Sequence, residues 1–594
     1  MSDLSSRLDT LLAAPAATAP SYAADGRLYF LCDAGGSAQV WELPADGGPA
    51  RPRSAHRDAV AFVAGSPADG GAVFGRDQAG DERVQLHALP PDGDARALTS
   101  DPRTIHGWGA FSPDGRFVAC TANDRDPAHT DPCVIELANG RMTRLLEVQG
   151  PHELPAWHPD GRAVILSTAP ESFRSDLLQV LLEGRQAAPL TLADGAWRHM
   201  NPRFRKDGSG FWLLCDRERD FLGVAFQEAT GEAPRFLFTP EADVEKLEVS
   251  PDQTRLAVVV NEGGFSRLYL LDVAGEVLER STHPAGVITK ITWRPDGGAV
   301  AFDLARPTHP GTLWLHEAGA AEARRIFAAA EAPEGLRDWA TVSFPTFDGR
   351  DLPAFLALPA GEPPEGGWPV LVWVHGGPAA QALPNWRPDL QMILSLGIAV
   401  LVPNVRGSTG YGRAYAALDD REKRPDSVRD LAAAHAWLAA QDRFDEARIG
   451  IMGQSYGGWM VLSAVTEQPQ LWAAGIDYYG IARWKTFFEK TGPWRIGHRA
   501  AEYGDPVRDA ALLETLSPLH KADRIICPML VAQGMTDPRV PPHESQQIVE
   551  AMRHRNVPVE YMTFADEGHG FLKRDNRRAV YLGVGNFLAR HLVG

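Results

Sequence analysis

The residues best suited to covalent chemistry form a G-x-S-x-G pattern at positions 453–457, with Ser455 at its centre. An apolar run (448–452) precedes the pattern, and a helix-like run (459–465) follows it. A serine exposed on a cramped turn between a strand and a helix can attack a carbonyl carbon, and the flanking glycines leave room for such a turn. The pattern therefore predicts that Ser455 is a nucleophile.

Two further side chains follow Ser455 in the order that a catalytic triad on an α/β-hydrolase chain requires. The apolar run 527–532 is typical of a buried strand and is followed by Asp537, while the run 559–564 predicts the next strand and is followed by His569. A helix is expected between them, over 543–556. Asp537 and His569 thus follow the carboxyl ends of two strands, which is the edge of an open α/β sheet where ligand sites form. We predict that His569 is the general base and that Asp537 orients its imidazole.

A serine hydrolase also needs fixed donors for the oxyanion of the tetrahedral intermediate. One is the backbone N–H of Tyr456, the residue after the nucleophile. The second comes from the loop after an earlier strand, here 370–374, which leads into His-Gly-Gly-Pro at 375–378. Pro378 has no N–H, so the glycines are the candidates, and Gly377 is the one we favour.

These motifs resemble the prolyl oligopeptidase family of serine peptidases, nearest to its acylaminoacyl-peptidase branch. The resemblance also includes Asn-Val-Arg-Gly-Ser-Thr-Gly-Tyr-Gly at 404–412, Asp-Pro-Arg-Val-Pro at 537–541 and Glu-Gly-His at 567–569, all in family order. It implies hydrolysis of short peptides through an acyl-enzyme, with a propeller that caps the active site. It also implies that Arg539, two residues after the acid, holds a substrate backbone carbonyl near the scissile bond.

The elements that position these residues occupy two regions, since 594 residues exceed what one hydrophobic core usually supports. The first region repeats a turn built on an aspartate, usually before glycine, ahead of an apolar strand. The turns are at Asp25, Asp69, Asp114, Asp160, Asp207, Asp252 and Asp296, spaced 44, 45, 46, 47, 45 and 44 residues apart. This is the period of a four-stranded propeller blade. We predict a seven-bladed β-propeller over 1–330, of which the first few residues could pack elsewhere.

The second region, 341–594, predicts an α/β-hydrolase domain. A linker is expected over 329–340, and a hairpin at 346–350 opens the domain. Strands, loops and helices then alternate as in parallel β-α units, with a strand over 397–402 and a helix over 427–440.

Two sets of residues that follow the turn at Ser455, which is called a nucleophile elbow, are candidates for binding substrate. The aromatic residues Trp459 and Tyr478 suggest an apolar side-chain pocket, although such residues also fill cores. In a protein that is acidic overall, Arg483, Arg495 and Arg499 gather within one segment. Structural ion pairs are one interpretation. The other is selection of the free C-terminal carboxylate of a short peptide, since a charge-assisted contact is stronger than a neutral one.

Composition excludes several classes of function. A formal net charge of −17 argues against nucleic acid as a partner. No apolar run is long enough for a membrane span, and the start of the chain lacks the pattern of a signal peptide, so we expect a cytoplasmic protein. The five scattered cysteines favour reduced thiols over disulfides, and none has metal-ligand spacing. We expect no metal and no cofactor.

The sequence thus predicts a serine peptidase that acts on short peptides as an exopeptidase or oligopeptidase, and as a homo-oligomer. An acylaminoacyl-peptidase-like enzyme and a carboxypeptidase are both open. One alternative is an esterase or lipase, which shares the chemistry. Another is a non-catalytic scaffold, because propellers are common interaction platforms.

Overall fold

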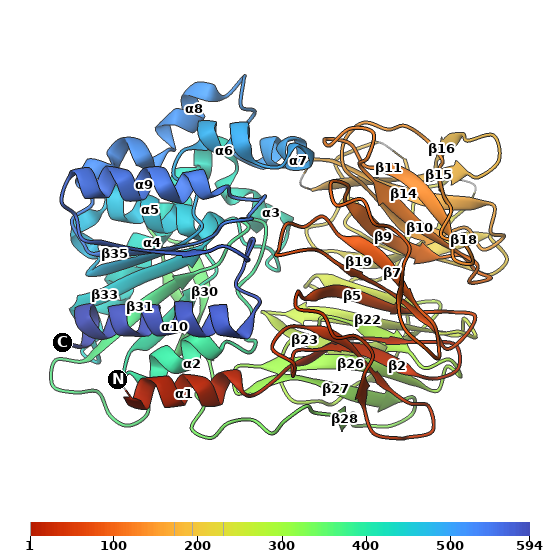
Figure 1. Ribbon diagram of the computed structural model, residues 1–594, viewed down its shortest axis with the longest axis horizontal. Helices are drawn as coiled ribbons and strands as arrows, with labels where there is room; N and C mark the ends of the chain where they lie inside the picture. The colour runs from red at the N-terminus through yellow and green to blue at the C-terminus, as the bar shows by residue number, and fades with distance from the viewer. Residues whose placement is uncertain (1, 172, 193, 230) are drawn as a thin grey trace.

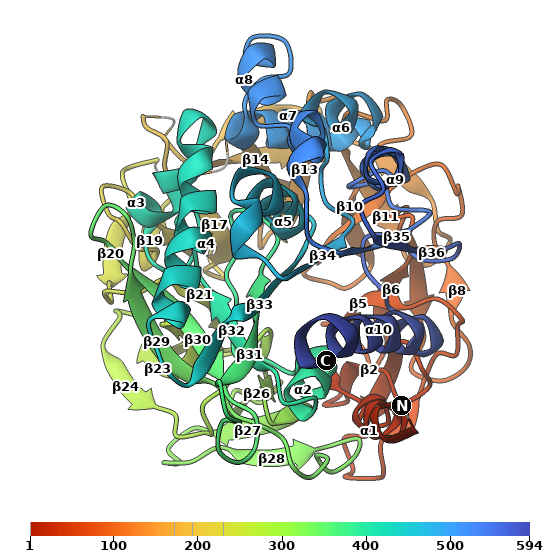
Figure 2. The same cartoon turned by 90° about the vertical axis from the view of Figure 1, so that its left-hand side faces the viewer.

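The computed structural model describes residues 2–171, 173–192, 194–229 and 231–594. A propeller built from strands β1–β28 faces a second domain whose sheet holds strands β29–β36 (Figure 1). Figure 2 views the molecule from the side of the second domain, with the propeller behind it. The predicted fold class, a seven-bladed β-propeller followed by an α/β-hydrolase domain, is confirmed.

Each blade of the propeller is a four-stranded antiparallel sheet whose strands follow one another in the chain. They are β1 (Ala17–Tyr22), β2 (Leu28–Cys32), β3 (Gln39–Leu43) and β4 (Arg51–Pro52); β5 (Val60–Gly65), β6 (Ala72–Arg76), β7 (Gln85–Leu89) and β8 (Arg96–Ala97); β9 (His106–Phe111), β10 (Phe117–Ala122), β11 (Asp131–Glu136) and β12 (Met142–Arg144); β13 (His152–Trp157), β14 (Ala163–Glu171), β15 (Arg174–Leu181) and β16 (Ala187–Pro189); β17 (His199–Phe204), β18 (Gly210–Cys215), β19 (Gly223–Glu228) and β20 (Arg235–Phe238); β21 (Val244–Val249), β22 (Arg255–Glu262), β23 (Phe265–Asp272) and β24 (Val277–Arg280); β25 (Ile291–Trp293), β26 (Ala299–Arg306), β27 (His309–Glu317) and β28 (Arg324–Phe327).

The repeated aspartate turn joins the first and second strands of every blade. In the third blade, the Asp114 carboxylate accepts hydrogen bonds from the Ser112 hydroxyl (2.6 Å) and the Arg116 N–H (3.1 Å). Gly115 follows with a φ of 69°, which glycine adopts without steric cost. The local bonding of this turn explains why the period is visible in the sequence.

Aromatic residues just before the turns hold neighbouring blades together, as their position in the sequence suggests. The indole of Trp157 donates to the carbonyl of Ala110 in the preceding blade (2.9 Å), and the indole of Trp293 does the same to Glu248 (3.2 Å). The last blade packs against β1 of the first without sharing a strand.

The second domain contains an eight-stranded sheet in the order β29-β30-β32-β31-β33-β34-β35-β36. The predicted hairpin joins the antiparallel pair β29 and β30, β30 runs antiparallel to β32, and the remaining neighbours are parallel. The strands are β29 (Ala340–Pro345), β30 (Asp351–Ala357), β31 (Trp368–Val374), β32 (Ala399–Pro403), β33 (Phe444–Gln454), β34 (Ala474–Tyr478), β35 (Met529–Gly534) and β36 (Val559–Phe564).

Helices cover both faces of this sheet. The α-helices of the described residues are α1 (Ser2–Leu12), α2 (Pro388–Ser395), α3 (Arg413–Ala416), α4 (Arg424–Ala439), α5 (Tyr456–Glu467), α6 (Trp484–Lys490), α7 (Pro493–Tyr503), α8 (Ala510–Thr515), α9 (Pro542–His554) and α10 (Arg574–Leu588). Helices α4, α5 and α9 pack on one face, and α2 and α10 on the other (Figure 1). Helix α1 lies against α2 and α10 of the hydrolase domain.

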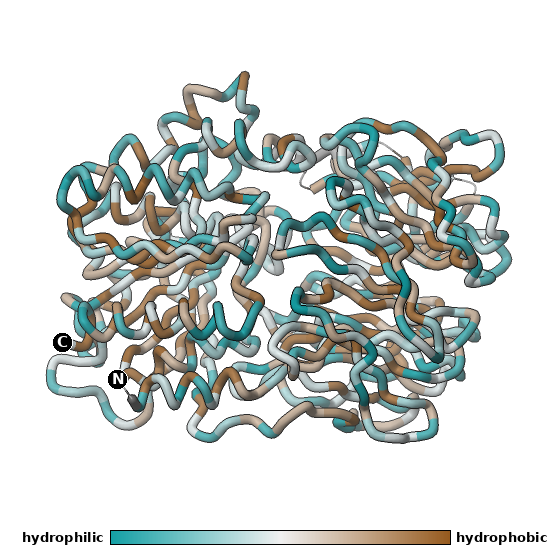
Figure 3. The backbone as a smooth tube through the Cα atoms, in the orientation of Figure 1, coloured by the Kyte–Doolittle hydropathy of each residue, from teal (hydrophilic) through white to brown (hydrophobic). Residues whose placement is uncertain are grey.

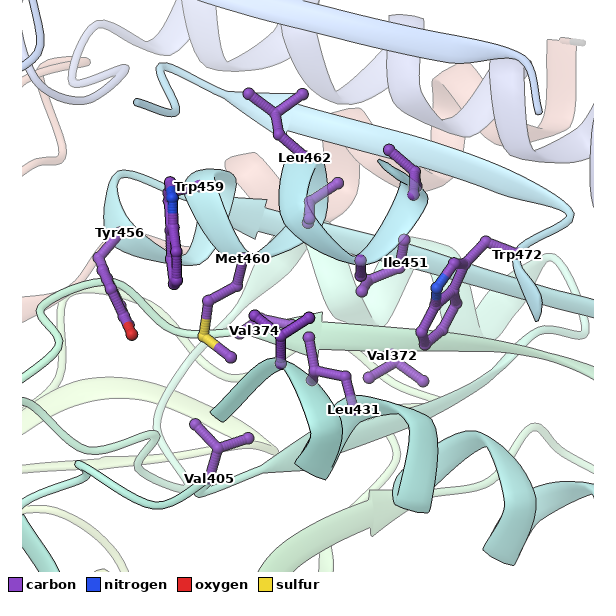
Figure 4. Close-up of a cluster of buried hydrophobic side chains, with 14 of the residues drawn as sticks. Val372, Val374, Val405, Leu431, Ile451, Tyr456, Trp459, Met460, Leu462 and Trp472 are labelled. Atoms are coloured by element: carbon purple, nitrogen blue, oxygen red, sulfur yellow. The ribbon is translucent and has the colours of Figure 1, made fainter. Parts of the chain in front are cut away.

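The hydrophobic core holds helix α5, which begins directly after Ser455, against the sheet. Alternate side chains of β31 face opposite layers, so Val372 and Val374 join one cluster while Leu371 and Trp373 join the other. Figure 4 shows Met460 of α5 among the valines of β31 and Leu431 of α4. Figure 3 shows hydrophobic residues along strands and helices, with hydrophilic residues in many surface loops.

The structure shows the state of the cysteines and whether the described residues form metal-type clusters or membrane-spanning helices. All five cysteines are free and buried. Within the described ranges, no three His, Cys, Asp or Glu side chains are grouped as a metal site. Among the helices of the same ranges, none combines the length and the apolar character that crossing a membrane would need.

Candidate active site

Ser455 occupies a strained turn between the end of β33 and the start of α5. Its backbone has a φ of 60° and a ψ of −122°, a conformation that is unfavourable for a residue with a side chain. Gly453 and Gly457 permit the turn, because a Cβ on Gly453 would lie 2.3 Å from the carbonyl oxygen of Gly457. The N–H of Ser455 donates to the carbonyl of Tyr478 (2.9 Å), which ties the turn to β34.

The three residues of the predicted triad lie in hydrogen-bonded contact. Nδ1 of His569 lies 2.7 Å from Oδ2 of Asp537, and Nε2 lies 2.9 Å from Oγ of Ser455. Donation from Nδ1 to the carboxylate leaves Nε2 free to accept the serine proton. Oδ1 of Asp537 accepts the N–H groups of Arg539 (2.8 Å) and Val540 (3.0 Å), so the carboxylate has a fixed orientation.

The loop that carries His569 is held from within the hydrolase domain. The ring of Tyr479 lies against the imidazole, with 4.6 Å between centroids. The buried carboxylate of Glu567 accepts the N–H groups of Leu572 (3.1 Å) and Lys573 (2.9 Å), which closes the loop onto the start of α10. Geometry of this kind keeps the imidazole aligned with Ser455.

The two residues predicted to bind the oxyanion belong to segments that adjoin Ser455. Tyr456 is the first residue of α5, where backbone N–H groups have no partner inside the helix. The loop after β31 passes beside Ser455, since a Cβ on Gly376 would lie 3.2 Å from the Cβ of Ser455. The neighbouring Gly377 has a φ of 137°, which favours glycine.

Helix α7 fastens this loop, a feature that the sequence did not reveal. The Tyr503 hydroxyl donates to the carbonyl of Gly377 (2.9 Å), and Arg499 donates to the same oxygen (3.3 Å). The Ala379 N–H donates to the carboxylate of Glu502 (3.2 Å). Burial raises the pKa of Glu502 to about 7.

Tyr503 also reaches the other predicted donor. Its ring stacks on that of Tyr456, with 6.1 Å between centroids and 11° between planes. One side chain of α7 therefore contacts both residues that are predicted to bind the oxyanion.

A propeller loop places a carboxylate beside Arg539 of the hydrolase domain. The carboxylate of Glu82, between β6 and β7, forms ion pairs with Arg539 and with Arg495 of α7. Burial opposes ionisation of Glu82, but the two guanidinium groups outweigh it and hold the pKa of the carboxyl below its usual value. Arg539 thus lines the cavity that contains Ser455, and its partner Glu82 was not predicted from the sequence.

The same propeller loop contacts the loops that carry Asp537 and His569. The Thr536 hydroxyl donates to the carbonyl of Ala79 (2.5 Å). Gly80 and Gly568 are so close that a Cβ on Gly568 would lie 1.9 Å from the carbonyl oxygen of Gly80. The propeller therefore participates in shaping the site.

Two of the residues proposed to bind substrate lie elsewhere. Trp459 is 1% exposed and donates its indole N–H to Leu516, so it is a core residue of the layer behind the elbow. In the sequence, the position of Trp459 on the helix could not distinguish a residue that lines a pocket from one that fills the core. Arg483 forms an ion pair with Glu514 (2.7 Å) and is not part of the cavity lining.

Tyr478, Arg499 and Arg539 do line the cavity that contains Ser455, whose volume is about 630 Å³. A second cavity of about 750 Å³ lies between the propeller and α7, and it shares Gly377 and Arg499 with the first. Arg495 lines this second cavity. Ser455 thus lines one of two adjoining cavities, and residues of both domains line the other.

Comparison with known proteins agrees with this arrangement. Residues 384–594 match the model of the prolyl oligopeptidase family. Dipeptidyl aminopeptidase BIII of Pseudoxanthomonas mexicana is 28% identical over 623 residues, which cover 99% of this chain and 88% of that protein. The acylamino-acid-releasing enzyme of Sus scrofa is 26% identical over 254 residues, 41% of this chain and 34% of that protein.

A solved structure has a similar fold. A puromycin-hydrolyzing peptidase of Mycobacterium tuberculosis superposes with a TM-score of 0.86 at 23% identity, covering 99% of this chain and 96% of that one. The family match over residues 384–594 and the relatives lead to one assignment: this part of the chain, which forms most of the second domain, belongs to the prolyl oligopeptidase family, and the protein is a serine peptidase.

Proposed function

We propose that the protein hydrolyses short peptides by acyl transfer to Ser455. His569 takes the serine proton as Oγ attacks the peptide carbonyl, and Asp537 stabilises the imidazolium that results. The N–H groups of Tyr456 and Gly377 bind the oxyanion, each worth on the order of 3 kcal/mol of barrier. His569 then gives the proton to the departing amine, and water releases the acyl group. The hydrogen-bonded series Asp537–His569–Ser455 is the observation that supports this most.

We further propose that the enzyme acts from the amino end of its substrates. Arg539 would hold a backbone carbonyl of the acyl part, and Glu82 contacts Arg539 from the propeller. Each carboxylate oxygen can accept a second hydrogen bond, so Glu82 can also take the α-ammonium group of a peptide. The similarity to a dipeptidyl aminopeptidase along nearly the whole chain favours the same end.

The carboxypeptidase alternative has weaker support than the sequence suggested. It rested on the gathering of cations in one segment of an acidic protein, yet Arg483 pairs with Glu514 and Arg495 with Glu82. Arg499 donates to Gly377 and lies 3.8 Å from Glu502. These residues therefore serve contacts within the protein.

A matched set of one short peptide in free, N-acetylated and C-amidated forms tests the proposal. Acetylation should lower kcat/KM at least about tenfold, because it removes the charge that Glu82 pairs with, whereas amidation should change it little. Glu82→Gln should abolish the difference between the free and acetylated peptides. A loss on amidation alone would instead establish the carboxypeptidase, and cleavage of esters but no peptide would establish an esterase.

A further inference from the structure

The cavity that contains Ser455 includes a recess whose walls are mostly aromatic. The residues that form this aromatic recess are Trp339, Trp373, Tyr478, Tyr479, Phe571 and Tyr581. Most of these rings are largely buried, so they are fixed in place by the surrounding core. Rigid aromatic walls next to a nucleophile provide a specific binding surface for a part of the substrate.

Contacts between the rings place the recess on the side of His569. Tyr479 packs on the imidazole, Phe571 packs on Tyr479 with 5.8 Å between centroids, and Tyr478 meets Phe571 edge-on at 5.4 Å. The imidazole gives its proton to the departing amine, so the leaving part of the substrate must pass along this side. The recess therefore faces the residues that follow the scissile bond.

Two charged residues of the cavity lining, Arg387 and Asp389, lie beside the aromatic recess, and their charges compensate each other. The guanidinium of Arg387 lies 4.1 Å above the ring of Trp373. It donates from Nε to Oδ1 of the buried Asp389 (2.9 Å) and from Nη2 to Oδ2 (2.5 Å). Because the pair is neutral overall, it adds no net charge that would attract an ionic side chain to the recess. A planar guanidinium stacked on an indole adds a flat surface that suits an aromatic ring.

We propose that the aromatic recess binds an aromatic side chain on the residue that directly follows the scissile bond. Substrates would thus be short peptides in which tyrosine or phenylalanine begins the leaving part. This inference rests on the proposed peptidase mechanism, because it assumes that His569 protonates the leaving amine. The energy comes from burial of the ring against Trp373 and its neighbours.

The test uses peptides with one fixed amino-terminal part and tyrosine, phenylalanine, alanine or aspartate after the scissile bond. We expect kcat/KM for the aromatic residues to exceed that for alanine at least about tenfold, since side chains that differ by several carbons give discrimination of this size or more. Equal values would overturn the inference alone. No hydrolysis of any of these peptides would overturn the proposed function and this inference with it.

Two variants test whether the aromatic recess causes the preference for an aromatic residue after the scissile bond. Trp373→Leu removes one wall and should lower the ratio of kcat/KM for tyrosine over alanine. Asn385→Trp, at another position in the cavity lining, should fill space and lower the same ratio without disturbing β31. Trp437→Leu, on the outer helix α4 and stacked on Phe344, is the control and should leave the ratio unchanged. If Trp373→Leu and Asn385→Trp both keep the parent ratio, the ring binds elsewhere and the inference is wrong.

Acyl transfer to an added amine gives an independent measurement. The amine nitrogen attacks the ester carbonyl of the acyl-enzyme, and Ser455 Oγ leaves and regains its proton from His569, which has accepted one from the amine. Tyrosinamide should intercept the acyl-enzyme at lower concentration than alaninamide, because it occupies the same recess. Equal interception would contradict the proposal.

Discussion

The contact of Tyr503 with both predicted oxyanion donors leads to a prediction for Tyr503→Phe. The variant keeps the ring that stacks on Tyr456 and loses only the hydroxyl that donates to Gly377. A neutral hydrogen bond contributes about 1 kcal/mol, while the oxyanion donor on this loop contributes on the order of 3 kcal/mol in the transition state. The contacts of Arg499 and Glu502 still hold the loop, so only part of the larger figure is at risk.

We therefore expect kcat to fall about tenfold, or about 1.4 kcal/mol of barrier, with KM changed less than about twofold because the interaction acts in the transition state. Steady-state kinetics on one peptide measures both values. Tyr29→Phe is the matched control, since its buried hydroxyl donates to the carbonyl of Gly70 (2.6 Å) in the propeller. It should reduce the melting temperature and leave kcat unchanged. An unchanged kcat in Tyr503→Phe, or a rise in KM alone, would refute the positioning role.

Three further predictions follow from other contacts. Gly568→Ala must displace the loop of His569 from the Gly80 carbonyl, so kcat/KM should fall at least about tenfold, while Gly35→Ala, whose Cβ would meet nothing within 4 Å, should be silent; similar activities would show that the propeller contact is dispensable. Arg539→Lys should lower kcat/KM by similar factors for peptides of different sequence, because an ammonium cannot copy the guanidinium fork; losses that depend on side chains would assign it another role. Burial raises the pKa of Asp477 to about 7 in the folded state, above its unfolded value, so the native state holds an extra proton between these values and its contribution to stability is lost as pH rises. Asp477→Asn should therefore gain in melting temperature relative to the parent between pH 5 and pH 8, and a constant difference would contradict the assignment of that proton.

The parts of the molecule that local chemistry determines could be predicted from the sequence. The aspartate turns bond within a few residues, so their period identified the blades. The elbow at Ser455 and the strand ends before Asp537 and His569 are likewise set by nearby residues, and the structure brings all three together.

The contacts that reach across the chain could not be predicted. Glu82 is separated from Arg539 by most of the sequence, and no local pattern marks it as an active-site residue. Tyr503 likewise contacts Gly377 through a hydrogen bond between residues that are far apart in the sequence. Trp459 was misassigned because helical position alone does not distinguish the face toward the substrate from the face toward the core.

The most direct test of the account is whether Ser455 is the residue that becomes acylated. Treatment with a fluorophosphonate, digestion and mass spectrometry should place the label on Ser455, and Ser455→Ala should lose both labelling and peptide hydrolysis, about a million-fold in rate, while it stays folded. Ser463→Ala, further along α5, should keep both. Label on another serine, or a tenth of the peptidase activity retained in Ser455→Ala, would contradict the account.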